Sequence, residues 1–328
     1  MIRHKRREFV KTVGSLGLLG CGQAIAQTLS GPALSFLVPQ PAGNPTDAIA
    51  RRLQASTQRE LAQPLVVENI PGAGGSLGVN RMLASQGAPV LLIASQTESI
   101  LTPLSVRAAR YSPESLRPVL LVTRGPYVLV GRVGLAANSF GDLIESARSI
   151  SAKPLSHGHI GNGSMIHLLG ERLSQKAGIS LNQVPYKGVP PVIQDIVGGQ
   201  IDLAFVPQSS VRDLAASGKL KVFASTSATA SEKMPKVPPI SKFNVALSDF
   251  VYGTWAAVFV RRSLREDEAL RLHKALTIAC HEPQFQSQTV ASGGDPSPPM
   301  TLAELEQFFS TETRLYQSMA REIGIQPE

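Results

Sequence analysis

The chain has 328 residues, 43% of them hydrophobic and 17% charged, which suits one large domain or two ordinary ones and is too little charge for a disordered protein. Residues 1–26 carry half of the formal net charge of +8, and no run of Lys or Arg follows residue 11. With only 5% aromatic residues to stack on bases, this distribution argues against nucleic-acid binding.

The first 26 residues have the pattern of an export signal. A basic stretch precedes a short apolar one, and Ala24–Ala26 reads A-x-A, so we expect cleavage before Gln27 and a periplasmic product. The apolar stretch is shorter than the ~20 residues that span a bilayer. Arg6 and Arg7 resemble a twin-arginine signal, with an ordinary Sec signal as the alternative.

The two cysteines have different expected roles. Cys21 ends a stretch that resembles a lipoprotein signal, but Leu19 stands where a small residue is expected, so lipidation is the less favoured outcome. After cleavage only Cys280 remains, so no internal disulfide can form. Cys280 is expected to be a buried small hydrophobe at a helix end.

Short apolar strands alternate with helices, which predicts an α/β protein with a parallel sheet covered on both faces. The predicted strands are Leu34–Val38, Leu65–Glu68, Val90–Ala94, Val119–Val122, Tyr127–Val130, Pro154–His157, Asn182–Val184, Ile201–Val206, Leu220–Ala224 and Val251–Val260. The predicted helices are Asp47–Leu61, Leu77–Ser85, one capped by Ser139 and running to Ser149, Met165–Ala177, Val189–Val197, Glu266–Ala279, and a last one opened by the capping box of Thr301 and Glu304.

The chain is expected to cross between two lobes twice, at Gly125-Pro126 and near Tyr252–Thr254. Lobe 1 would then comprise residues 31–125 and 252–328, and lobe 2 residues 126–251. The polar stretch Ser225–Asp249 is expected to wrap the surface.

The loop Pro39–Asp47 joins the first strand to the first helix. Gly43 there can adopt a positive φ, and Thr46 or Asp47 is the expected helix cap. The first N–H groups of a helix have no partner and the dipole is positive there, so the loop suits a small anion. A plain strand-to-helix connection is the alternative.

A second glycine-rich turn, Asn69–Gly78, lacks the third glycine of a dinucleotide fingerprint and the lysine of a P-loop, so a ligand or hinge loop is the better interpretation. A third, Gly158–His167, lies between a strand and a helix and is rich in histidine. It has no Cys or carboxylate at ligand spacing, so we expect no metal. Lys187 could hold a carboxylate as a point charge, or be an ordinary surface lysine. No G-x-S-x-G elbow or paired catalytic groups occur, which favours a receptor over an enzyme.

These segments resemble the substrate-binding proteins of tripartite tricarboxylate transporters, the Bug-type periplasmic receptors. The resemblance rests on FLVPQPAGNPTDAIARRL, VVENIPGAGGSLGVNRM, GNGSMIHLLGERL, VPYKGVPPVIQDIVGGQIDLAF, SGKLKVFAST and TWAAVFV, and covers essentially the whole mature chain. It implies a two-lobe periplasmic-binding-protein-like (Venus flytrap) fold with a central cleft that closes on a small carboxylate. It also implies no cofactor, a monomer, and membrane transporter subunits as partners.

Two departures from the family pattern bear on the ligand. Asn44 stands where a second glycine is usual, and Val206-Pro207 stand where many members carry Asp and a polar residue. An apolar wall there predicts preference for an apolar or aromatic monocarboxylate over an acidic amino acid. The residues expected to bind ligand are Ala42, Gly43, Asn44, Thr46, Asp47, Gly74, Ser95, Gln96, Thr97, Gly161, Asn162, Gly163, Ser164, His167, Tyr186, Lys187, Val206 and Pro207.

Two rival functions stay open at this point. One is an envelope hydrolase that uses Ser164 or His167 in the cleft, which turnover of candidate esters would reveal. The other is an orphan sensory receptor that docks on a signalling protein rather than on a permease.

Overall fold

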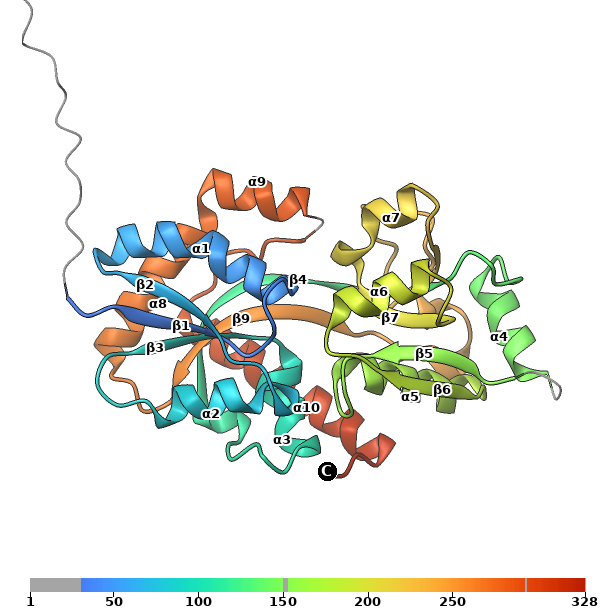
Figure 1. Ribbon diagram of the computed structural model, residues 1–328, viewed down its shortest axis with the longest axis horizontal. Coiled ribbons are helices and arrows are strands. Elements are labelled where there is room, and N and C mark those ends of the chain that lie inside the picture. The colour runs from blue at the N-terminus through green and yellow to red at the C-terminus, as the bar shows by residue number, and fades with distance from the viewer. Residues whose placement is uncertain (1–30, 150–152, 293, 328) are drawn as a thin grey trace, which may run out of the picture.

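The computed structural model describes residues 31–149, 153–292 and 294–327 (Figure 1). The expected export signal, Cys21 and the cleavage site lie outside these ranges. The strands are β1 (Leu34–Val38), β2 (Leu65–Asn69), β3 (Val90–Ala94), β4 (Leu116–Gly131), β5 (Leu155–His159), β6 (Leu181–Pro185), β7 (Leu203–Pro207), β8 (Lys221–Ser225) and β9 (Gly253–Arg261). The α-helices are α1 (Pro45–Leu61), α2 (Ser76–Ala84), α3 (Thr102–Ser105), α4 (Phe140–Arg148), α5 (Met165–Ala177), α6 (Val189–Val197), α7 (Arg212–Ala216), α8 (Glu266–His281), α9 (Pro283–Ala291) and α10 (Leu302–Ile323).

The strands form one connected sheet in the order β2-β1-β3-β9-β4-β7-β5-β6, with β8 also paired to β4. The expected parallel pairing is found for β1 with β2 and β3, and for β5 with β6 and β7. It is wrong for β4, whose pairings with β7, β8 and β9 are all antiparallel. Two parallel units are therefore joined through antiparallel strands, as Figure 1 shows.

Strand β4 corrects a second expectation, because the two strands predicted at Val119–Val122 and Tyr127–Val130 form one continuous strand. The strand pairs with β9 as far as Pro126 and with β7 and β8 from Tyr127 onward. Pro126 lacks an N–H, and it lies where the strand changes partners, so little pairing is lost. We propose that the lobe boundary falls at this change of partner, with residues 31–125 and 252–328 on one side and 126–251 on the other.

Two hydrophobic cores hold the elements in place. One lies between α1, α8 and the β1–β3 half of the sheet and includes Phe36, Leu53 and Leu272. The larger one runs under both halves. Helix α10 packs on β4 and on α5, so it spans the two halves.

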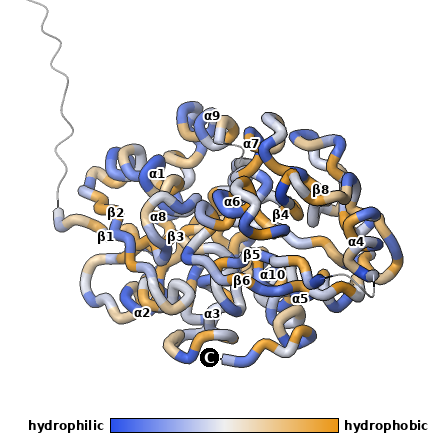
Figure 2. The backbone as a smooth tube through the Cα atoms, turned by 45° about the vertical axis from the view of Figure 1, so that its right-hand side comes forward, coloured by the Kyte–Doolittle hydropathy of each residue, from blue (hydrophilic) through white to orange (hydrophobic). Residues whose placement is uncertain are grey.

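Hydropathy alternates along the outer helices in Figure 2, as expected for helices with one buried face. The predicted bounds of α5 and α6 are confirmed, and so are the helix cap at Ser139 and the capping box of Thr301 and Glu304. Cys280 is fully buried, as expected. In the described ranges, no helix is long and apolar enough to cross a membrane.

Candidate functional site

A cleft of about 1130 Å³ lies between the two halves of the molecule. Its walls come from the loop after β1 and the first half of α1, the turn after β2, the segment after β3, and the loops before α5 and α6. Ligand sites in proteins usually measure roughly 300–1,000 Å³. The cleft therefore has room for a small organic molecule together with water.

The start of α1 is uncapped and lines this cleft. Asn44 is the N-cap residue, but its side chain makes no cap bond and donates instead to the carbonyl of Pro41 at 3.0 Å. The next residue, Pro45, has no N–H. No acceptor among the described residues meets the N–H of Thr46 or Asp47, so the positive end of the helix is open. The expectation that Thr46 or Asp47 caps the helix is wrong, because both lie inside it.

Asp47 holds the shape of the turn before the helix. Its carboxylate accepts from the N–H of Gly43 at 2.9 Å, from Arg51 Nε at 3.0 Å and from Asn69 Nδ2 at 3.0 Å. Burial opposes ionisation, but these hydrogen bonds prevail and lower the pKa of Asp47 below its usual value. Gly43 has the expected positive φ of 85°, yet its N–H is already taken.

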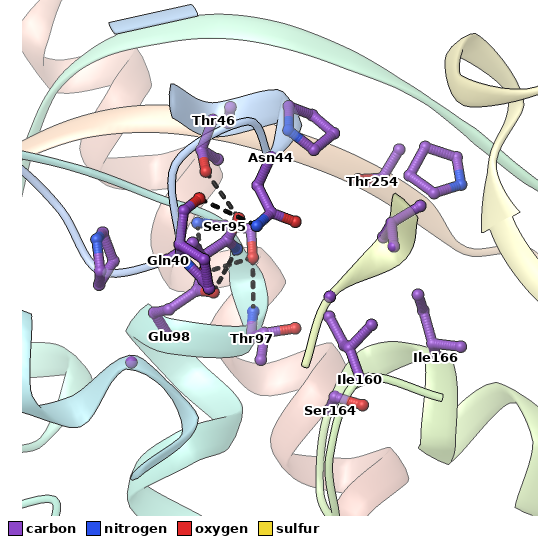
Figure 3. Close-up of a pocket in the computed structure, with 18 of the residues that line it drawn as sticks. Gln40, Asn44, Thr46, Ser95, Thr97, Glu98, Ile160, Ser164, Ile166 and Thr254 are labelled. Carbon is purple, nitrogen blue, oxygen red and sulfur yellow. Dashed lines mark hydrogen bonds between the residues drawn. The ribbon is translucent and has the colours of Figure 1, made fainter. Parts of the chain in front are cut away.

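A hydrogen-bonded chain of four side chains forms the wall beside Thr46 (Figure 3). The Thr46 hydroxyl donates to Gln40 Oε1 at 2.7 Å, and Gln40 Nε2 donates to Glu98 at 2.6 Å. Ser95 donates to Glu98 through its N–H at 2.9 Å and its hydroxyl at 2.6 Å. Sequence reasoning missed Glu98, although Ser95 and Glu98 have the Ser-x-x-Glu spacing of a capping box.

In the facing loop, before α5, backbone N–H groups donate to acceptors within the protein. Gly161 N–H donates to His159 Nδ1 at 3.2 Å, and Gly163 N–H donates to His167 Nδ1 at 3.1 Å. The Ser164 hydroxyl accepts from the His167 N–H at 3.4 Å and so caps the helix. Of the first three amides of α5, only that of Ile166 meets no acceptor among the described residues, so this helix start is less open than that of α1.

Burial lowers the pKa of His157 and of His159 to about 4. Both rings are neutral at pH 7; His159 accepts from the loop, whereas His157 bonds Gln183 on β6 and the N–H of Phe205 on β7. No group of three or more potential metal-ligating side chains occurs among the residues that the structure describes.

Eleven of the expected site residues line the cleft: Gly43, Asn44, Thr46, Gly74, Ser95, Thr97, Gly161, Asn162, Ser164, Lys187 and Pro207. Seven do not: Ala42, Asp47, Gln96, Gly163, His167, Tyr186 and Val206. Gln96 is buried and donates to the Tyr127 hydroxyl at 2.6 Å. The Tyr186 hydroxyl donates to Asp195 at 2.6 Å.

Two further placements correct the sequence-based picture. Val206 is fully buried in the sheet, so it cannot form the apolar wall that was expected of it. Gly163 packs on α3, where a Cβ would lie 2.1 Å from Cβ of Ser105. Across the cleft from α1, a Cβ on Gly188 would lie 2.8 Å from Asn44 Oδ1, so the loop carrying Lys187 lies close to the start of the helix.

The family model of the tripartite tricarboxylate transporter family receptor matches residues 49–325. The chain belongs to this receptor family. Protein BugT of Bordetella pertussis is 29% identical over 307 residues, which cover 91% of each chain. These proteins are solute-binding receptors and not enzymes, which agrees with a Ser164 hydroxyl that caps a helix and a His167 that does not line the cleft.

Two solved structures confirm the fold. The periplasmic binding protein BugD superposes with a TM-score of 0.80 at 25% identity, covering 90% of this receptor and 99% of BugD. MatC from Rhodopseudomonas palustris, solved with bound malate, gives a TM-score of 0.79 at 24% identity and covers 88% of this receptor and 98% of MatC. The expected α/β periplasmic-binding-protein fold is therefore correct.

Proposed function

We propose that this receptor captures a small organic carboxylate in the cleft, with the carboxylate at the open start of α1. The observation that carries the proposal is the N–H of Thr46, which lines the cleft and meets no acceptor in the described residues, with the equally unpaired N–H of Asp47 behind it. Such groups at the positive end of a helix donate charge-assisted hydrogen bonds to an anion.

Lys187 supplies a second, weaker attraction from the facing wall. It is exposed and lies next to Gly188, which contacts Asn44. An exposed ammonium is largely screened by solvent and salt, so the amides of α1 supply most of the affinity.

The partners follow from the family. The receptor passes its ligand to the membrane subunits of a tripartite tricarboxylate-type transporter and works as a monomer. It reaches the periplasm after cleavage before Gln27.

N-terminal sequencing of the exported protein tests the cleavage site, and a lipidated Cys21 or an uncleaved chain would contradict it. Loss of carboxylate uptake on deletion of the receptor, with no change in signalling, separates the transport role from a sensory one.

A thermal-shift screen of the chain from Gln27 against a carboxylate library tests the proposal. Malate, the ligand in the MatC structure, is the first compound. A ligand at 100-fold its Kd adds about 2.7 kcal/mol to the free energy of unfolding, so a binder raises the melting temperature by several degrees. A screen in which only neutral or cationic solutes raise the melting temperature would contradict the proposal.

A further inference from the structure

Helix α1 lines the cleft with residues of its first two turns. Pro45, Ala48, Ile49 and Arg52 all line the cavity. Their spacing of i, i+3, i+4 and i+7 places them on one face of the helix. At ~1.5 Å of rise per residue, Arg52 lies about 9 Å along the helix axis from Thr46.

Arg52 is a cation without a carboxylate partner in the part of the chain that the structure describes. Its neighbour Arg51 pairs with Asp47, and Arg59 on the same helix pairs with Glu282. Arg52 instead donates through Nη1 to Ser292 Oγ at 2.9 Å and to the carbonyl of Gln288 at 3.4 Å. The donors on Nε and Nη2 meet no acceptor among the described residues, and Arg52 lines the cleft.

Other polar groups gather at this end of the cleft. Thr289 on α9 lines it, is only 2% exposed, and has a buried hydroxyl with no hydrogen-bond partner in the described residues. Ser209 and Ser210, which follow β7 on the facing side, also line it. A guanidinium with spare donors that lines the cleft marks a place for a negatively charged group of a ligand.

The stretch between the two ends is apolar. Ala48 and Ile49 line it from α1, and Pro190 and Ile193 line it from α6. A ligand that lies along α1 therefore meets amides at one end, hydrocarbon in the middle and a guanidinium at the other end.

We infer that Arg52 forms a second anion subsite, so that the preferred ligand is an elongated dianion with an apolar chain and not the apolar monocarboxylate expected from the sequence. The inference rests on the proposed function, which places the first carboxylate at the start of α1. The competing structural role of Arg52 is to bind carbonyls at the C-terminal end of α9, as basic side chains often do.

Calorimetry on matched acids separates these roles. Adipate and suberate are compared with hexanoate and octanoate, which have the same chain lengths but one carboxylate. The proteins are the unmutated receptor, Arg52→Met, and Arg271→Met, which removes an exposed arginine of α8 outside the cleft. We expect the unmutated receptor and Arg271→Met to bind the better diacid at least ~10-fold more tightly than its monoacid counterpart. In Arg52→Met the diacid should fall to the level of the monoacid, whose own affinity stays the same.

Two results would overturn the inference while the proposed function stands. One is diacid binding that stays intact in Arg52→Met. The other is an equal weakening of diacid and monoacid binding, as a purely structural role requires. If the unmutated receptor binds neither class of acid, the inference fails, and the thermal-shift screen of the carboxylate library then decides the proposed function.

Discussion

The N–H of Met165 donates to Oγ1 of Thr97 at 3.3 Å, which ties the first turn of α5 to the segment after β3. This bond makes the two helix starts at the cleft unequal. In α5 the N–H of the first residue donates to Thr97 and the N–H of the third residue donates to Ser164. In α1 the first two N–H groups, those of Thr46 and Asp47, meet no acceptor among the described residues. We therefore propose that the carboxylate binds at the start of α1 and that α5 forms a wall of the cleft.

Gly163→Ala should lower the free energy of unfolding of the protein without ligand. Its Cβ would lie 2.1 Å from Cβ of Ser105, and its φ of 71° disfavours any side chain. We expect a loss of about 1–3 kcal/mol in the free energy of unfolding, measured in urea. In a Ser105→Gly background the same change should cost less. Equal costs in both backgrounds would show that the close approach to Ser105 is not the cause.

Lys187→Ala should weaken carboxylate binding by less than ~10-fold at physiological salt, because an exposed ammonium is screened. The effect should shrink further as salt is raised. Binding constants at low and high ionic strength measure both points. A complete loss of binding at every salt concentration would make the site a simple ion pair.

Acidification should destabilise the protein between about pH 6.5 and pH 4. Burial lowers the pKa of His157 to about 4, so in this window the unfolded chain takes up a proton that the folded chain refuses. The free energy of unfolding then falls by up to about 1.4 kcal/mol per pH unit for each such histidine. Urea titrations across this window should give a smaller slope for His157→Gln than for the unmutated protein. Parallel slopes would contradict the assignment.

Local patterns predicted some of the fold well. The bounds of α5 and α6, the cap at Ser139 and the capping box at Thr301 depend on residues within one or two turns. The continuity of β4 through Pro126 was missed because it depends on which strands lie beside it, which the sequence does not display.

The sequence predicted correctly which residues line the cleft only where their place between a strand and a helix determines it. Gly43, Asn44 and Thr46 line the cleft because they follow a strand and open a helix. Asp47 and Gln96 do not, because each is bound to neighbours distant in sequence. Arg52 was overlooked because the pair Arg51-Arg52 looks like a solvated helix face, and only the position of α9 shows that the second arginine lines the cavity.

The most direct test of the open helix start compares Thr46→Pro with Thr46→Ala. Both remove the hydroxyl that donates to Gln40, but only proline removes the N–H. Proline is tolerated in the first turn of a helix, and α6 already carries Pro190 and Pro191 there. Calorimetry with the best carboxylate from the screen should show Thr46→Pro binding at least ~10-fold more weakly than Thr46→Ala, the effect of losing one charge-assisted hydrogen bond. Equal affinities of the two variants, at equal melting temperatures, would contradict the account.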